Sequence, residues 1–285
     1  MKRLSGITAI ILVLVLITGA LVAGCSPAGS PKLKVVTSTS LIAQIVQRVG
    51  GDKVDVVNII APAQCPGHFD IKPGDIRKLA DADLFLLHGW QGEKFSQDLI
   101  ASANNPDLTV VKINVKVGEN DNWMTPPVQK AATDKIANAL AQVDAENSTY
   151  YHQLAAEYKD KISALEAEIK ARIAPLNPSQ VNVICAQMQA GFVSWAGLNI
   201  VATYGRPDSL TPQVVKELVD KGKAANVSLI IDNLQSGKDA GAGIAEELGC
   251  PRVILSNFPG AVDNTETWEK AIDYNIRLIM EALGH

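Results

Sequence analysis

The sequence predicts an α/β protein of two lobes, each with a mainly parallel sheet flanked by helices, joined by one long helix. Short apolar runs alternate with helical patterns through residues 33–113, and the same alternation returns after residue 180. Such a rhythm is typical of βαβ units and a parallel sheet. Between these regions, residues 128–173 show helical patterns and no strand signal. Together these observations predict two α/β lobes with a helical link.

The predicted first lobe covers residues 33–146. The run at 84–87 is wholly apolar, as expected of a strand that is buried on both faces. Asp75 follows Pro73-Gly74, a pattern typical of a helix start. The expected strands are 33–38, 54–60, 84–87 and 108–113, and the expected helices are 40–49, 76–82, 93–103 and 128–143.

A helix rich in Ala, Glu and Lys is predicted to form the link at 147–175, because Pro175 and Pro178 end the helical pattern. The second lobe then covers 176–285. Its expected strands are 181–185, 227–231 and 252–255, and its expected helices are 212–225, 239–248 and 265–283. Ligands of open α/β sheets bind beyond the carboxyl ends of the strands, so two lobes predict a cleft between them. The expected cleft loops are 61–75, 88–92, 114–126, 186–192, 232–238 and 256–264.

The N-terminus has the layout of a bacterial secretory signal. Met1-Lys2-Arg3 is basic, residues 7–22 are almost uninterrupted apolar, and Val22-Ala23-Gly24-Cys25 matches the box before a lipidated cysteine. The apolar run is shorter than the roughly 20 residues that span a bilayer. We therefore predict a cleaved lipoprotein signal at 1–24, acylation of Cys25 and a tether at 25–32. The lipid would hold the protein in the cell envelope, at the extracytoplasmic face of the membrane.

Charge and motif patterns exclude several function classes. Without Lys2 and Arg3, 24 of the 26 basic residues remain against 30 acidic ones, so nothing favours nucleic acid as a partner. The chain has no Gly-x-Ser-x-Gly, phosphate-loop or His-Glu-x-x-His pattern. A pair such as Cys65 and His68 could act as nucleophile and base, but the signal is short. We predict a protein that is not an enzyme.

Several segments resemble the cluster A-I substrate-binding proteins of metal-ion ABC transporters, the zinc- and manganese-binding group. They are 35–40, Pro66 with 73–76, 79–84, 230–235 and Tyr274-Asn275, and the resemblance covers essentially the whole mature chain. It implies a rigid backbone helix between the lobes, which then open only slightly. It also implies a metal ion as cargo, with a permease and an ATPase as partners. We expect a monomer.

The ligand positions of that family are not matched here. Where its members have Pro-His in the first ligand loop, this chain has Pro66-Gly67, with His68 one position later. No histidine precedes Trp123, where the second family ligand is expected. The third position corresponds to Gln187, and the fourth to Ser256 or Asn257. The usual four-ligand site is therefore not expected.

A different metal site is suggested by the residues themselves. Cys65-Pro66-Gly67-His68 predicts a type II turn that brings Cys65 and His68 together. Cys185 ends the first strand of the second lobe, where alternation places Gln187 on the same side. Thiolate and imidazole suit a soft or borderline ion such as copper or zinc. The hypothesis is a site of Cys65, His68 and Cys185, completed by Gln187, Met188 or Asp232, with Asp70 in support.

Other interpretations of these residues stay open. Cys185 is equally consistent with a small buried apolar residue, and Cys65 and Cys185 could instead form a disulfide between the lobes. His88 suits either the cleft or a hydrogen bond to a loop carbonyl. Trp90 and Trp123 fall in expected cleft loops. A cleft with tryptophans and few charges would hold a small organic ligand or a metal wrapped in a chelator.

Overall fold

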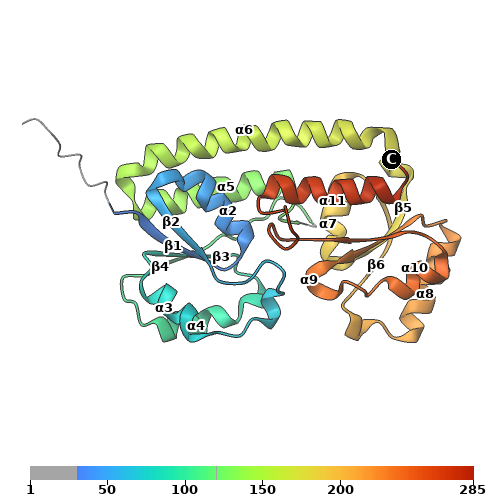
Figure 1. Ribbon diagram of the computed structural model, residues 1–285, viewed down its shortest axis with the longest axis horizontal. Helices are drawn as coiled ribbons and strands as arrows, with labels where there is room; N and C mark the ends of the chain where they lie inside the picture. The colour runs from blue at the N-terminus through green and yellow to red at the C-terminus, as the bar shows by residue number, and fades with distance from the viewer. Residues whose placement is uncertain (1–30, 120) are drawn as a thin grey trace, which may run out of the picture. The chain divides into compact units, whose positions relative to one another are not determined.

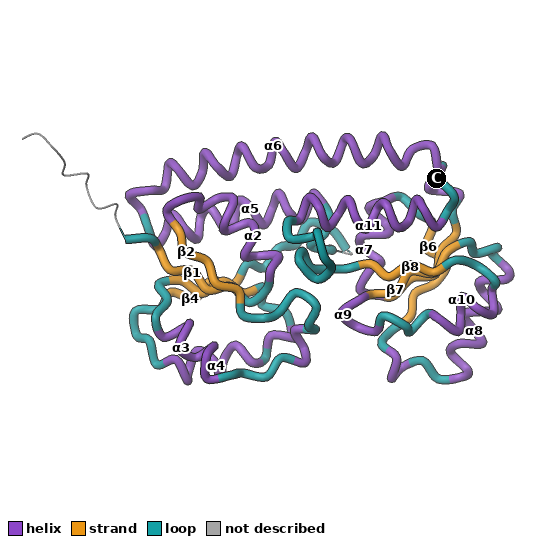
Figure 2. Tube along the Cα trace, viewed as in Figure 1, coloured by secondary structure: helices purple, strands orange, loops and turns teal. Residues whose placement is uncertain are grey.

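Two parallel sheets form the framework of the protein (Figures 1 and 2). The computed structural model describes residues 31–119 and 121–285, so the predicted signal at 1–24 and lipidation at Cys25 lie outside the described residues. From Lys32 on, the chain forms one compact unit. Each sheet has four strands, and all strand pairs within them are parallel. The predicted fold class is therefore confirmed, whereas the predicted residue limits of the lobes and the link stay predictions.

The first lobe is built on a sheet with the order β2-β1-β3-β4. Its elements are β1 (Leu33–Thr37), α2 (Ser40–Gly50), β2 (Val54–Asn58), α3 (Pro73–Ala80), β3 (Leu84–Leu87), α4 (Phe95–Ala103), β4 (Thr109–Lys112) and α5 (Pro126–Val143). Alternation along β3 sends Leu84 and Leu86 into the core beneath α2 and α5, and Phe85 and Leu87 into the core with α3 and α4. Helices thus cover both faces of the sheet, as its apolar strands require.

The second lobe repeats this plan with the strand order β6-β5-β7-β8. Its elements are β5 (Asn182–Ala186), α7 (Ala190–Ala196), β6 (Asn199–Tyr204), α8 (Pro212–Ala224), β7 (Leu229–Asn233), α9 (Leu234–Gly237), α10 (Ala242–Leu248), β8 (Arg252–Leu255) and α11 (Trp268–Ala282). Val183 and Cys185 of β5 enter the core with α7 and α11, whereas Ile184 and Ala186 enter the core with α8 and α10.

The long helix α6 (Ser148–Ile173) joins the lobes and packs on α2 and α5 of the first and on α11 of the second (Figure 1). Its 26 residues span about 39 Å at the usual rise. The hydrophobic core beneath it is continuous between the lobes, since it includes both Ile136 of α5 and Ile276 of α11. No helix in the described ranges is both long enough and apolar enough to cross a membrane.

Three elements of the second lobe, α7, β6 and the four-residue α9, are missing from the sequence predictions. Helix α7 has only seven residues, too few for its periodicity to be distinctive. Strand β6 lies at the edge of the sheet, and most of its side chains are partly exposed, so it lacks the wholly apolar run that marks β3. The loop after β6 was for this reason not among the expected cleft loops.

Candidate functional site

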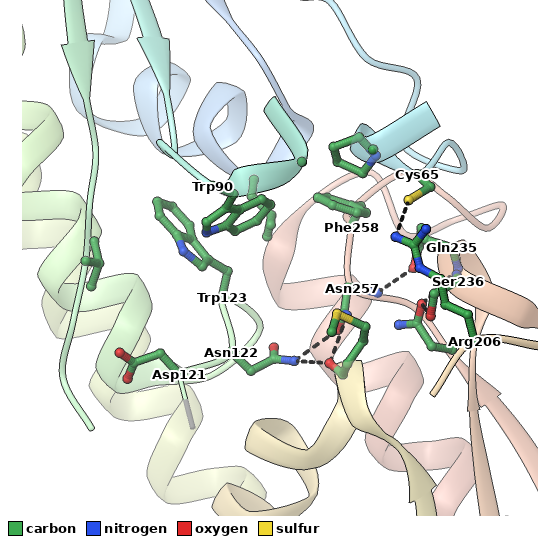
Figure 3. A pocket seen from close by; sticks show the side chains of 17 residues that line it. Cys65, Trp90, Asp121, Asn122, Trp123, Arg206, Gln235, Ser236, Asn257 and Phe258 are labelled. Carbon is green, nitrogen blue, oxygen red and sulfur yellow. Dashed lines mark hydrogen bonds between the residues drawn. The ribbon is translucent and has the colours of Figure 1, made fainter. Parts of the chain in front are cut away.

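A cavity of about 380 Å³ lies between the two lobes, beyond the carboxyl ends of the strands (Figure 3). Residues that follow each of β1–β8 contribute to its lining. The first wall comes from the first lobe and consists of Leu41, Cys65, Pro66, Gly67, Trp90, Gly92, Val115, Asp121, Asn122 and Trp123. The second wall comes from the second lobe and consists of Met188, Arg206, Asn233, Gln235, Ser236, Asn257 and Phe258. The expected position of the cleft thus contains a cavity that both lobes build.

Trp90 is the most exposed aromatic side chain of the first wall, at 39%. One face of its indole stacks on His88, with ring centroids 3.6 Å apart and planes 6° from parallel. Trp123 stands nearly perpendicular to it, at 89°. The buried Glu93 carboxylate fixes this loop, because it accepts the backbone N–H groups of His88 (3.1 Å), Gly89 (2.6 Å) and Trp90 (3.2 Å) and the Ser38 hydroxyl (2.5 Å). The indole is therefore held as a firm surface at the cavity.

His88 lies behind Trp90 and does not line the cavity. Its Nε2 is 2.7 Å from the Thr39 hydroxyl, so its partner is a side chain and not a loop carbonyl. Burial in the protein lowers the pKa of His88 well below its ordinary value, which keeps the ring neutral at physiological pH. Its structural effect is to support Trp90.

Cys65 and His68 are brought together, although not by the expected turn. Residues Pro66–His68 form a 3₁₀ turn, closed by the His68 N–H donating to the Cys65 carbonyl at 3.0 Å. A type II turn would need a positive φ at Gly67, which Gly67 does not have. Arg206 contacts both side chains: its Nη2 is 3.3 Å from Cys65 Sγ (Figure 3), and its Nη1 is 3.3 Å from His68 Nε2. A guanidinium cation thus contacts the two atoms that a metal ion was expected to join.

Cys185 does not reach the cavity, because its side chain is fully buried in the core with Val183. Burial raises the pKa of its thiol to about 12, as expected of a sulfur in apolar surroundings. The inter-lobe disulfide is not formed, since Cys65 and Cys185 are both free. Strand β5 ends at Ala186 and a 3₁₀ turn follows, so the alternation does not extend to Gln187, which is exposed outside the cavity.

The two acidic residues of the predicted site are also placed elsewhere. Asp232 is fully buried, and its Oδ1 accepts hydrogen bonds from the Tyr204 hydroxyl (2.6 Å) and the Gly241 N–H (2.8 Å). Its Oδ2 pairs with Arg252 at 2.5 Å, so the carboxylate is fully occupied in holding the second lobe. Asp70 is exposed and lies outside the lining. Within the part of the chain that the structure describes, no three His, Cys, Asp or Glu side chains are grouped to hold a metal ion.

Hydrogen bonds cross between the lobes beside the cavity. Asn122 donates to the Met188 carbonyl (3.0 Å) and to Asn257 Oδ1 (3.1 Å), and Gln235 donates to the Pro62 carbonyl (3.2 Å). Four of the predicted site residues line the cavity, namely Cys65, Trp90, Trp123 and Met188. Asn257, one of the two residues named for the fourth family position, also lines the cavity, whereas Asn122, Gln235 and Arg206 were not singled out as ligands by sequence reasoning. The β-branched residues Ile200 and Val201 are a sequence signal for strand β6, and Arg206 lies in the loop after that strand.

Comparison with protein families identifies a match over most of the chain. The family described as zinc-uptake complex component A, periplasmic, matches residues 35–282. Among the curated proteins that are similar to this chain, two from streptococci serve as examples. The metal ABC transporter substrate-binding lipoprotein SsaB of Streptococcus sanguinis is 24% identical over 281 residues, which is 90% of each chain. The manganese ABC transporter substrate-binding lipoprotein PsaA of Streptococcus pneumoniae is 26% identical over 290 residues, which is 91% of each chain.

Solved structures agree in fold. A Cd-bound periplasmic metal binding protein from Candidatus Liberibacter asiaticus has a TM-score of 0.77 and 17% identity, over 88% of this chain and all of that one. The solute-binding protein FpvC of P. aeruginosa, in complex with Ni²⁺, has a TM-score of 0.75 and 21% identity, over 88% of this chain and 96% of that one. These matches confirm the two-lobed architecture.

Proposed function

Because this chain belongs to the periplasmic zinc-uptake complex component A family, we propose that it captures a metal-containing solute in the cavity between its lobes and delivers it to an ABC importer. The family match confirms the resemblance that the sequence motifs suggested. Members of this family are solute-binding proteins of ABC transporters, so the prediction that the chain is not an enzyme is also confirmed.

The observation that carries the proposal is the position of the cavity. Its lining is assembled from residues at or after the carboxyl ends of all the described strands of both sheets, so a solute inside it would contact both lobes at once. Relatives named for metal or manganese transport, and solved structures with Cd or Ni²⁺, support a metal in the cargo. The cargo would be held by side chains on a framework that α6 keeps together.

The membrane attachment and the partners are part of the same proposal. The relatives named above are lipoproteins, which supports acylation of Cys25 after removal of residues 1–24. The protein would then work as a lipid-anchored monomer outside the membrane, beside a permease and an ATPase. Zinc and copper were the ions expected from a site with two thiolates. With Cys185 in the core, Cys65 and Met188 are the sulfur side chains left in the lining, which weakens the case for a bare soft ion.

Native mass spectrometry with elemental analysis tests the proposal, on the chain purified in mild detergent under reducing, anaerobic conditions. We expect one metal per chain, retained alone or within a larger bound mass. Met188→Trp, which narrows the cavity from an exposed position, should lower the retained amount. Val117→Trp, at a similarly exposed position outside the lining, is the matched control. A chain that retains and takes up no metal in any form would refute the proposal.

A further inference from the structure

One positive and one negative side chain line the cavity, and they differ in how far their hydrogen-bonding groups are already occupied. Asp121 and Arg206 are its charged lining residues. Both oxygens of Asp121 are engaged by its own loop, since they accept the N–H groups of Gly118 (2.8 Å) and Val117 (3.0 Å). Arg206 makes no salt bridge with any residue that the structure describes. The formal charges of the two side chains cancel, but Arg206 is the one whose hydrogen-bonding groups remain free for a ligand, and this favours an anion over a bare divalent cation.

Arg206 retains the capacity to bind an anion. Its contacts to Cys65 and His68 are both 3.3 Å long, and a thiol sulfur is a weak acceptor. A guanidinium has five N–H donors in a planar fork, and this geometry matches a carboxylate with two parallel hydrogen bonds. Arg206 is also exposed at the cavity, where it follows β6 directly after Gly205. A carboxylate or phenolate that enters can therefore pair with it.

Asn233 supplies a second, independent donor. The residue is 1% exposed, lines the cavity and has an Nδ2 group without a hydrogen-bond partner in the described structure. Its Oδ1 accepts from the Gln235 N–H (3.1 Å), the Ser236 N–H (2.9 Å) and the Ser236 hydroxyl (2.8 Å), which fixes the orientation of the amide. A buried N–H donor without a partner is costly unless a ligand accepts from it. An amide N–H₂ donates to oxygen and does not ligate a cation.

The exposed face of Trp90 and the volume of the cavity indicate the shape and size of the ligand. His88 covers one face of the indole, and the exposed remainder is available for stacking against a flat, delocalised group. The ring of Trp123 lies beside that of Trp90, nearly perpendicular to it. A volume of about 380 Å³ lies within the range of small-molecule sites and far exceeds the need of a single dehydrated ion.

We infer that the ligand which fills this cavity is a flat organic anion, bound together with its metal, whose oxygens pair with Arg206 and Asn233 while its ring lies on Trp90. This inference rests on the proposed function and names the chemical class of the cargo. The ligands of the metal are then atoms of the anion. The cargo therefore needs no cluster of three ligating side chains, and the described residues contain none.

Calorimetric titration of the full chain in detergent tests the inference with six probes: picolinate, its zinc complex, the uncharged analogue picolinamide, 2,3-dihydroxybenzoate, Zn²⁺ alone and Mn²⁺ alone. We expect the zinc complex to bind, and Arg206→Gln to weaken it about tenfold, as the loss of one charged hydrogen bond implies. Asn233→Asp keeps the acceptor that Ser236 uses and removes the donor, so it should weaken the complex by a similar factor. Arg77→Gln, which removes an exposed charge outside the lining, should change nothing.

The two variants separate the outcomes. If Zn²⁺ or Mn²⁺ alone binds one to one, and Asn233→Asp strengthens it, the cargo is a bare cation and the inference is overturned while the proposed function stands. If free picolinate binds but its zinc complex does not, and no metal is found by elemental analysis, the anion site stands and the metal cargo fails. If neither picolinate nor 2,3-dihydroxybenzoate binds, free or with metal, at millimolar concentration, the inference is wrong.

Discussion

The two walls of the cavity differ in how their side chains are held. In the first wall, Trp90 stacks on the ring of His88, and the backbone N–H groups of His88, Gly89 and Trp90 donate to the buried Glu93 carboxylate. In the second wall, the guanidinium of the exposed Arg206 has its hydrogen-bond contacts in the first lobe, at Cys65 and His68. Trp90 is thus fixed from within its own lobe, whereas the side chain of Arg206 is held by contacts across the cavity.

This difference suggests a division of tasks. A surface fixed in advance loses little conformational freedom when a ligand stacks on it, which favours affinity. A charged side chain that bridges the lobes can exchange its weak contacts for a stronger one with the ligand, which favours selectivity for charge. The comparison can be tested by removing the support of each wall in turn.

Glu93→Ala should have the largest effect, because it leaves three backbone N–H groups and the Ser38 hydroxyl without their acceptor in a buried loop. We expect the free energy of unfolding to fall by about 3 kcal/mol, with greater quenching of Trp90 fluorescence by acrylamide. Urea titration measures the first quantity. Glu281→Ala, which removes an exposed ion pair with Arg277, should have no measurable effect. Equal effects of the two substitutions would show that the loop is held by other contacts.

Asn122→Ala should cost about 2 kcal/mol of unfolding free energy, since it leaves the Met124 N–H and Asn257 Oδ1 without their partner. Because Asn122 joins the two lobes, its loss should also weaken cargo binding. Asn105→Ala is the matched control, because Asn105 bonds the carbonyls of Leu79 and Ala82 within the first lobe alone. If both variants weaken cargo binding equally, inter-lobe hydrogen bonding is not what preserves the site.

The thiols of the two lobes should behave differently as well. Cys185→Ser places a hydroxyl in the core without a partner and should cost about 1.5 kcal/mol of unfolding free energy, whereas Cys65→Ser should leave stability unchanged. Since burial raises the pKa of Cys185 to about 12, almost no thiolate forms there at neutral pH. Alkylation followed by peptide mapping should label Cys65 in the folded protein and Cys185 only after unfolding. Rapid labelling of Cys185 in the native state would contradict its placement in the core.

His88 should make stability depend on pH in one direction. Its pKa is lowered in the folded state, whereas in the unfolded chain it returns to about its ordinary 6.5. The unfolded state therefore binds more protons below that pH, so stability is complete above about 6.5 and falls as the pH decreases toward the folded-state value. His88→Phe keeps a ring on Trp90 and should reduce this slope in urea titrations between pH 7 and 5. An unchanged slope would assign the pH dependence to other groups.

The alternating sheet pattern was predictable from the sequence because short apolar runs, the clearest of them at 84–87, alternate with helical patterns. The same criterion missed β6, whose edge position leaves it partly exposed, and with it the loop that carries Arg206. A cavity residue was thus overlooked because the strand before it does not need to be apolar. Edge strands are marked by β-branched residues more than by hydrophobic runs, and Ile200-Val201 is such a signal.

The candidate metal site shows a second limit. The proximity of Cys65 and His68 followed from their spacing, which a 3₁₀ turn satisfies as well as a type II turn. The direction of Cys185 did not follow, because a residue at the end of a buried strand faces a helix layer or the next loop depending on register. That Arg206 lies against Cys65 depends on how two lobes meet, which local patterns do not encode.

The continuous core beneath α6 has a consequence for how the protein unfolds. Because one hydrophobic cluster is shared by both lobes, neither can lose its packing without exposing apolar surface of the other. We therefore expect the lobes to unfold as a single cooperative unit and not as two domains that melt separately. For the proposed permease, separating the lobes would be costly in free energy. We expect it to act at the edge of the cavity, where polar contacts such as that of Asn122 with Asn257 join the two sides.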